Sequence, residues 1–167
     1  MMTLPQGFSP EERAEKAMAL FRQGFNCTQS VILAFADVLE ASGLASEQLL
    51  KIIGSGFGGG MGRMREVCGA FSGCTMMAGF ISPADVPADM EARKANYAIV
   101  QEFAERFRQV NGGSIVCREL LGLGKAAAPE SPAPSARTAE YYRKRPCPQI
   151  IGNAARIVAE KMLARGV

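Results

Sequence analysis

The chain has 167 residues, of which 48% are apolar and 21% are charged, and its 19 basic and 16 acidic side chains leave a net charge of +3. This length and apolar content suit one domain with a full hydrophobic core and exclude a disordered chain. The positive charge is too small and too scattered to predict a nucleic-acid surface. Histidine is absent, which excludes Ser-His-Asp and Cys-His catalysis, zinc sites with a histidine ligand, and haem held by a proximal histidine.

The first half of the chain predicts three helices. Ser9 is followed by proline and two glutamates, a pattern typical of a helix start, and Gly24 ends this first helix. Asn26 caps a second helix, which continues through an apolar stretch to Leu39. A short third helix over 46–53 leads into a glycine-rich loop.

The second half predicts further helices and one long loop. In chain order these are a compact helix of small residues over 68–80, an amphipathic helix over 89–110, a short helix capped by Ser114 and containing Cys117, a Pro/Ala-rich loop over 124–137, and a last helix opened by Pro146-Cys147-Pro148. No segment alternates convincingly with the period of a strand. The expected fold is all-α: a single domain over 1–167, built as an irregular bundle of about six helices.

The cell compartment is predicted from two features: the start of the chain and its longest uncharged run. No basic segment followed by an apolar core opens the chain, so no secretory signal is expected. The longest uncharged run, 68–84, is interrupted by glycine and proline and falls short of a bilayer span. We therefore expect a cytoplasmic protein with no membrane segment. Cytosolic thiols stay reduced, so several cysteines in one chain favour redox chemistry or metal ligation over a disulfide scaffold.

Four cysteines, Cys27, Cys68, Cys117 and Cys147, each lie at or near a predicted helix start. Helix N-termini favour anions, and a thiol placed there can fall from a pKa of about 8.5 to between ~3.5 and ~7.5. The thiolate attacks disulfides and binds metals. The alternative is that these cysteines are small buried apolar side chains. Cys74 lies about 240° around the helix from Cys68, so we expect it in the core.

Two glycines follow Cys68 on one helical face. Gly69 and Gly73 are four residues apart, so another helix backbone can approach closely there and bring its own cysteine to Cys68. We name both glycines as candidate cofactor-binding positions. Tight helix packing alone is an equally good explanation of them.

Two basic segments are candidates for binding anions. Arg63 and Arg65 lie on the glycine-rich loop, which can hold a small anion through backbone N–H groups. Arg143-Lys144-Arg145 adjoins two tyrosines and can steer an acidic partner. For both segments, basic side chains in solvent are the simpler expectation.

Read in order, the chain contains Cys27, Gly59-Gly60-Met61-Gly62, Cys68-Gly69-Ala70-x-x-Gly73, Cys117-Arg118 and Cys147. This pattern resembles the C_GCAxxG_C_C family of redox-active proteins, and it extends from about Glu12 to Leu163. The resemblance implies a redox role that rests on the cysteines at 27, 68, 117 and 147. It assigns no role to Cys74 or to the proline-rich loop at 129–134.

Three functions are consistent with these residues. The first is a thiol-based redox protein, an oxidoreductase if it turns over, in which Cys68 or else Cys27 is the attacking thiolate and the electron donor or thiol partner is unidentified. The second is a metal site, an iron–sulfur cluster or structural zinc held by Cys27, Cys68, Cys117 and Cys147. The third is a non-catalytic helical interaction protein whose cysteines are core. A homodimer would suit the glycine face and the apolar helix faces.

Overall fold

The computed structural model describes residues 2–125 and 129–166. Within these residues the protein is all-α, as predicted. The helices are α1 (Pro10–Arg22), α2 (Cys27–Leu33), α3 (Ala36–Ala41), α4 (Glu47–Gly54), α5 (Gly69–Ile81), α6 (Met90–Val110), α7 (Cys117–Leu120), α8 (Ala139–Lys144) and α9 (Cys147–Arg165), with a 3₁₀ turn, η1 (Ser55–Phe57), after α4. The six helices of seven residues or more match the expected number.

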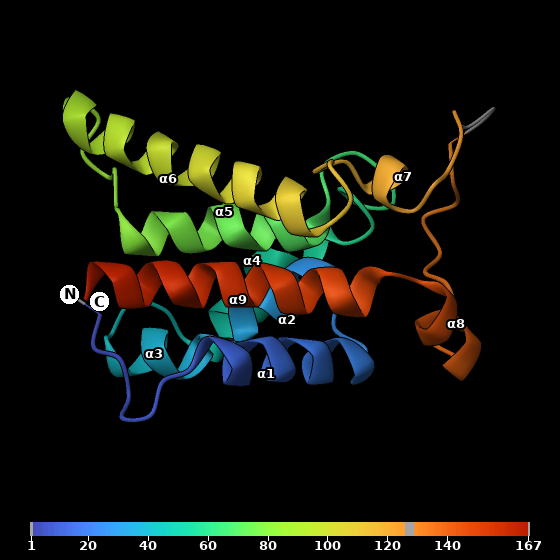
Figure 1. Ribbon diagram of the computed structural model, residues 1–167, viewed down its shortest axis with the longest axis horizontal. Coiled ribbons are helices and arrows are strands. Elements are labelled where there is room, and N and C mark those ends of the chain that lie inside the picture. Colours follow the sequence, from blue (N-terminus) through green and yellow to red (C-terminus); the bar gives the residue numbers. More distant parts are fainter. Residues whose placement is uncertain (1, 126–128, 167) are drawn as a thin grey trace.

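Helix α9 is the centre of the bundle. Figure 1 shows α6, α5, α9 and α1 stacked as four roughly parallel rods, and α9 packs against α1, α2, α5 and α6. Its inward face carries fully buried side chains such as Ile151, Val158 and Met162, each of which stabilises the fold by about 1.5–3 kcal/mol through burial. The chain termini lie together at one end of the bundle, and α7 and α8 lie at the other.

The expected helix starts are largely confirmed. The Ser9 side chain accepts a hydrogen bond from the Glu12 N–H at the start of α1, and Asn26 forms a reciprocal capping box with Gln29 at the start of α2. The last helix begins at Cys147 with proline in its first turn. The cap expected at Ser114 is wrong: α7 starts after Val116, and the Ser114 hydroxyl accepts from the Val116 N–H instead.

The helix predicted to run from Asn26 to Leu39 is broken, and a buried arginine accounts for the break. Helix α2 ends at Leu33 and α3 starts at Ala36. The Ala34 carbonyl at the break accepts a hydrogen bond of 2.8 Å from Arg13, whose guanidinium also bonds to the Asp37 carboxylate at 2.5 and 2.9 Å. Helix α8 was not predicted at all.

Helices α2 and α5 approach closely at the two glycines. A Cβ at Gly69 would lie 2.9 Å from the Cβ of Cys27, and one at Gly73 would lie 2.7 Å from the Cβ of Val31. The Thr28 hydroxyl donates a 2.7 Å hydrogen bond to the Gly69 carbonyl. This contact sets the start of α2 against the start of α5, which brings Cys27 toward Cys68.

Across the described ranges, no helix combines the length and the apolar character needed to cross a membrane.

Candidate functional site

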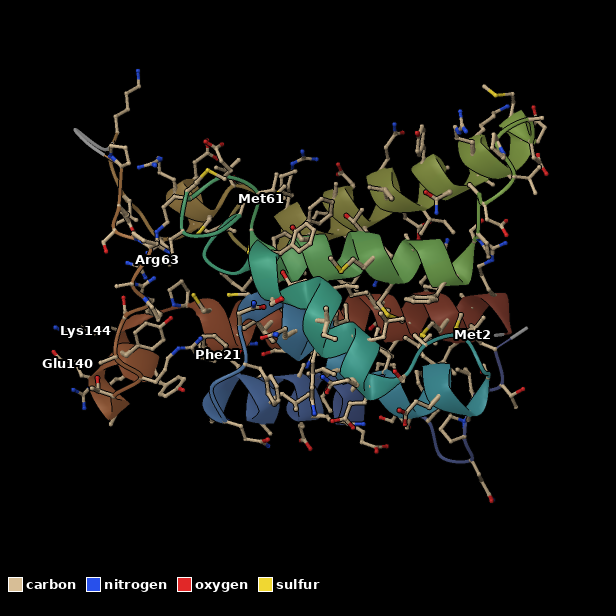
Figure 2. The ribbon with its side chains drawn as sticks, turned by 180° about the vertical axis from the view of Figure 1, so that it is seen from behind. Met2, Phe21, Met61, Arg63, Glu140 and Lys144 are labelled. Atoms are coloured by element: carbon tan, nitrogen blue, oxygen red, sulfur yellow. The ribbon has the colours of Figure 1, made fainter. Side chains whose placement is uncertain are left out.

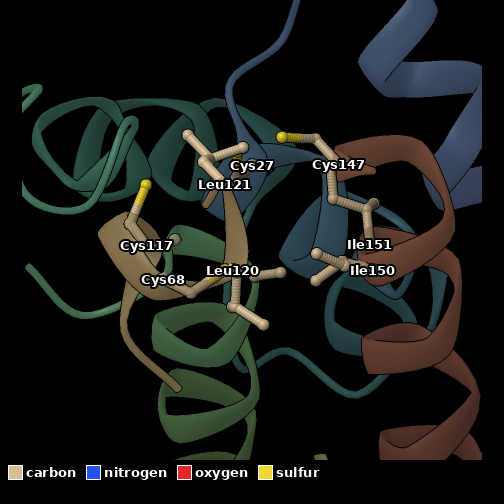
Figure 3. A pocket seen from close by; sticks show the side chains of 10 residues that line it. Cys27, Cys68, Cys117, Leu120, Leu121, Cys147, Ile150 and Ile151 are labelled. Atoms are coloured by element: carbon tan, nitrogen blue, oxygen red, sulfur yellow. The ribbon is translucent and has the colours of Figure 1, made fainter. Parts of the chain in front are cut away.

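The four cysteines at helix starts converge on one cavity. Cys27, Cys117 and Cys147 are the first residues of α2, α7 and α9, and Cys68 is the N-cap of α5. All four line an apolar cavity of about 20 Å³, whose other walls come mainly from leucine and isoleucine side chains of α7 and α9 (Figure 3). A cavity of this size holds about one water molecule. Segments up to 120 residues apart therefore place their sulfur atoms around one small space.

Two of these cysteines are buried and tied together through the backbone. The Cys68 N–H donates to the Ile115 carbonyl at 2.8 Å, and the Cys117 N–H donates to the Glu66 carbonyl at 2.7 Å. These bonds flank an antiparallel bridge between Val67 and Val116. In such a pairing Cys68 and Cys117 fall on the same face as diagonal neighbours. We call these two the inner cysteines.

The other two, Cys27 and Cys147, are half-buried, and we call them the outer cysteines. Both line the small cavity, and interaction with the Cys27 thiol lowers the pKa of Cys147. The same interaction, together with burial, holds the pKa of Cys27 well above its ordinary value. One thiol of this pair therefore ionises far more readily than the other.

The inner cysteines are held in the protonated form. Burial raises the pKa of Cys68 to about 12, although the N–H groups of Ala70 and Phe71 at the start of α5 act in the opposite direction. Burial also raises the pKa of Cys117, against the nearby Arg65 guanidinium. The expectation that all four thiols shift toward thiolate is therefore wrong for Cys27, Cys68 and Cys117. Loss of solvent opposes ionisation of a thiol, and for Cys68 it outweighs the helix N-terminus.

The glycine-rich loop gives Cys117 its place. Gly60 has a φ of +69°, and a Cβ there would lie 2.6 Å from the Cβ of Cys117 and 2.8 Å from the Glu66 nitrogen. Only a residue without a side chain fits both the left-handed backbone and this contact. Within the Gly-Gly-Met-Gly segment, Gly60 is thus the residue that leaves room for an inner cysteine.

Arg65, expected in solvent, is buried beside the cysteines. It is 5% exposed, and its Nη1 lies 3.9 Å from the Cys117 Sγ. Its other nitrogens bond to both Glu130 oxygens, Nε to Oε1 at 2.9 Å and Nη2 to Oε2 at 2.8 Å. Sequence reasoning missed this role, and a basic residue three positions after the Gly-Gly-Met-Gly segment is the only signal for it.

The remaining candidates are also placed. Gly69 lines the cavity, whereas Gly73 is buried against Val31 of α2. Cys74 is fully buried away from the cavity, as predicted, and its thiol donates to the Ala154 carbonyl at 3.6 Å. Among residues 2–125 and 129–166, no group of three or more cysteine or carboxylate side chains is arranged to hold a metal ion.

Three of the four cysteines also face a wider opening. Cys27, Cys117 and Cys147 line a cleft of about 340 Å³ between the glycine-rich loop, the described part of the Pro/Ala-rich loop and α8, whereas Cys68 does not. The outer cysteines are thus reached from outside the molecule through this cleft.

A comparison with known families agrees with the arrangement of the cysteines. The family model described as "Putative redox-active protein (C_GCAxxG_C_C)" matches residues 25–161, a range that contains all four cysteines of the cavity. No curated protein and no solved structure matches the chain.

Proposed function

The chain belongs to the C_GCAxxG_C_C family of redox-active proteins, and on that premise we propose that it exchanges disulfides through its outer cysteines. The observation that carries the proposal is the pair of thiols at the cleft, one with a lowered and one with a raised pKa. A low-pKa thiolate next to a second thiol is the arrangement that thiol–disulfide exchange requires.

The exchange has two steps. The Cys147 thiolate attacks one sulfur of a disulfide RS–SR, which forms a Cys147–SR mixed disulfide and releases RS⁻. Cys27 then loses its proton and attacks the Cys147 sulfur, which forms a Cys27–Cys147 disulfide and releases the second RS⁻. The two protons given up by the cysteines are taken by the two RS⁻ groups. The protein is oxidised by two electrons, and the external disulfide is reduced by two.

This assignment revises the expected nucleophile. Cys68 was the first candidate and Cys27 the second, but Cys68 is buried with a raised pKa and does not reach the cleft. Cys147 is half-buried at the cleft and is the only one of the five cysteines with a lowered pKa. Of the inner cysteines, Cys68 lines only the small apolar cavity, and Cys117 lines both the cavity and the cleft.

The test is a redox titration of the reduced protein against a buffer of oxidised and reduced dithiothreitol, with free thiols counted and the disulfide located by peptide mass spectrometry. We expect the count to fall from five thiols to three, with one Cys27–Cys147 bond. Cys147→Ser and Cys27→Ser should each keep all four of their thiols, and Cys74→Ala, which removes the core cysteine, should form the same bond as wild type. The proposal is overturned if the disulfide forms between other cysteines, or if no disulfide forms at any redox potential of the buffer.

The convergence of four cysteines on one cavity also keeps the metal-site function as a second candidate. In that function Cys27, Cys68, Cys117 and Cys147 would hold an iron–sulfur cluster or zinc, each ligand as a thiolate. The raised pKa of both inner cysteines opposes this function. Protein purified without oxygen decides the matter: two or four iron atoms with sulfide, or one zinc ion, per chain would favour the metal site over disulfide exchange if Cys68→Ser removes the bound metal.

We place this chemistry in a reducing compartment such as the cytoplasm, because all five cysteines are free in the structure and thiols persist there. A protein that leaves the reducing compartment would be recovered with the Cys27–Cys147 bond already formed, which alkylation of freshly lysed cells detects.

A further inference from the structure

The cleft above the outer cysteines has the dimensions of a small-molecule site. Its volume is about 340 Å³, at the lower end of the roughly 300–1,000 Å³ that ligand pockets occupy. A folded protein partner instead needs a contact surface of about 800 Å² on each side. The cleft is therefore sized for a low-mass thiol or disulfide.

Basic side chains dominate the polar lining of this cleft. Arg63, Arg65, Arg137 and Arg145 contribute to its walls, and no aspartate or glutamate is among the described residues that line it. The whole chain carries only +3, so this concentration of guanidinium groups is a property of the site. Figure 2 shows Arg63 at the same end of the molecule as Lys144 and Phe21, opposite Met2.

Two of the four guanidinium groups are already matched with a carboxylate. Arg65 bonds to both oxygens of Glu130, and Arg63 lies 3.2 Å from Glu130 Oε2 and donates to the Ser131 carbonyl at 2.9 Å. These contacts fasten the Pro/Ala-rich loop to the glycine-rich loop and so build one wall of the cleft. Glu130 neutralises one of these two charges.

The other two guanidinium groups face the reacting pair without a carboxylate partner. In the parts of the chain that the structure describes, no acidic side chain lies within ion-pair distance of Arg137 or Arg145. Their guanidinium carbons lie 5.1 and 4.9 Å from the centre of the Tyr141 ring, so one aromatic side chain stands against both. Arg145 is two residues before Cys147.

Arg137 is held rigidly. Its Nη1 donates to the Phe21 carbonyl at 3.2 Å and its Nη2 to the Phe25 carbonyl at 3.3 Å, and its guanidinium carbon stands 4.3 Å from the centre of the Phe21 ring. A guanidinium fixed in this way is preorganised for a carboxylate and loses little conformational freedom on binding. Arg137 thus has neutral partners but no carboxylate partner, and it is anchored in the cleft rather than extended into solvent. This arrangement indicates a ligand with a negative charge.

From these contacts we infer that the cleft binds a low-mass disulfide whose carboxylate lies between Arg137 and Arg145 while its sulfur faces Cys147. This inference names the substrate class of the exchange and rests on the proposed function. A carboxylate at this place would fix the disulfide beside the attacking thiolate. A cleft lined with one sign of charge also raises the local concentration of ions of the opposite sign. This raises their association rate by roughly 10- to 1,000-fold.

The test compares two disulfides on the reduced full-length protein. Dithiodipropionate is anionic at neutral pH and hydroxyethyl disulfide is neutral, and both present a simple alkyl disulfide to the thiolate. The measured quantity is the ratio of their second-order rates of reaction with Cys147, followed by stopped flow and mass spectrometry. Because both reagents meet the same thiolate, the ratio cancels any effect of a substitution on the pKa of Cys147.

We expect wild type to prefer the anionic disulfide by at least about tenfold. Arg145→Gln and Arg137→Gln should each bring the ratio close to one. Arg143→Gln is the matched control, because Arg143 belongs to the same basic run but is exposed and does not line the cleft; its ratio should stay as in wild type. Circular dichroism checks each fold, and Arg145→Gln remains informative if loss of the Arg137 contacts unfolds the chain.

The outcomes separate the two proposals. If neither disulfide oxidises Cys147, the proposed exchange itself is wrong. If both react at the same rate in wild type, or if Arg143→Gln lowers the ratio as much as Arg145→Gln, the exchange stands and the carboxylate site is overturned.

Discussion

The outer and inner cysteines start from equivalent positions in the chain and end with opposite chemistry. Cys147 and Cys68 both lie at the N-terminus of a long helix, at α9 and α5. Cys147 is half-buried at a basic cleft and its pKa is lowered, whereas Cys68 is 7% exposed in an apolar cavity and its pKa is raised to about 12. Position at a helix start alone therefore does not activate a thiol; access to solvent and interaction with a neighbouring thiol decide the outcome.

The largest difference between the two regions should appear in alkylation. At pH 7.5 the thiolate fraction of Cys68 is lower than that of Cys147 by about a thousandfold or more, since their pKa values lie on opposite sides of the ordinary value. The greater nucleophilicity of a more basic thiolate offsets part of this factor. We therefore expect iodoacetamide to modify Cys147 at least about thirty times faster than Cys68, measured for each residue by peptide mass spectrometry.

Cys27→Ser sharpens this comparison, because it removes the second thiol of the outer pair while its hydroxyl can still donate a hydrogen bond to the Cys147 thiolate. Cys147 should still react faster than Cys68 in this variant, since the cleft and Arg145 are unchanged. Equal rates at Cys68 and Cys147 in wild type would contradict the division into outer and inner thiols.

The next largest effect is on the free energy of unfolding, and it concerns Gly60, which packs against the inner cysteine Cys117. Gly60→Ala adds a Cβ that would lie 2.6 Å from the Cβ of Cys117, on a backbone with φ of +69°. Left-handed strain costs about 1–2 kcal/mol and overpacking adds about 1–3 kcal/mol. Urea unfolding should therefore show a loss of about 3 kcal/mol.

Gly62→Ala is the matched control for the contact with Cys117. Gly62 also has a positive φ, +54°, but a Cβ there would come no closer than 3.8 Å to the Gly56 carbonyl oxygen. It carries the strain without the clash, so its loss should be about 1 kcal/mol. Equal losses in the two variants would show that the contact with Cys117 contributes nothing.

The smallest effect is the dependence of stability on alkaline pH. Because the folded pKa of Cys68 is raised from 9.0 to about 12, the folded protein retains a proton that the unfolded chain releases above about pH 9. The stabilisation from the protonated thiol is complete below pH 9 and is lost as the pH rises toward 12. This group alone should lower the free energy of unfolding by up to about 1.4 kcal/mol per pH unit in that window.

Cys68→Ala isolates this contribution, since it removes the thiol while leaving every other alkaline group in place. The difference between the free energies of unfolding of wild type and variant should narrow steadily from pH 9 to pH 10.5 in urea titrations. A constant difference over that range would mean that Cys68 ionises as easily in the folded protein as in the unfolded chain.

Much of the fold follows from local sequence signals. The caps at Ser9 and Asn26, the small-residue helix after Cys68 and the amphipathic helix ending at Val110 are all found where the pattern predicts them. Local rules failed where a distant group intervened. The break at Ala34 depends on Arg13, which lies 21 residues away, and no periodicity within the broken helix reports that contact.

The candidate site divides in the same way. Its cysteines were identified by their helix-start positions and by the spacing around Gly69, since both are properties of a few consecutive residues. Arg65 was assigned to solvent because its partner, Glu130, lies 65 residues further along the chain. Arg137 was not identified for the same reason: the carbonyls that hold it belong to the end of α1 and the turn after it.

The sequence by itself determined that four thiols stand at helix starts and that a glycine face lets two of those helices meet. Only the tertiary structure decided which thiol ionises, which stays protonated and which guanidinium groups surround them. The reason is physical. A helix start is made by hydrogen bonds within one turn, whereas the pKa of a thiol is fixed by the water excluded from it and by charges that the fold brings from distant segments.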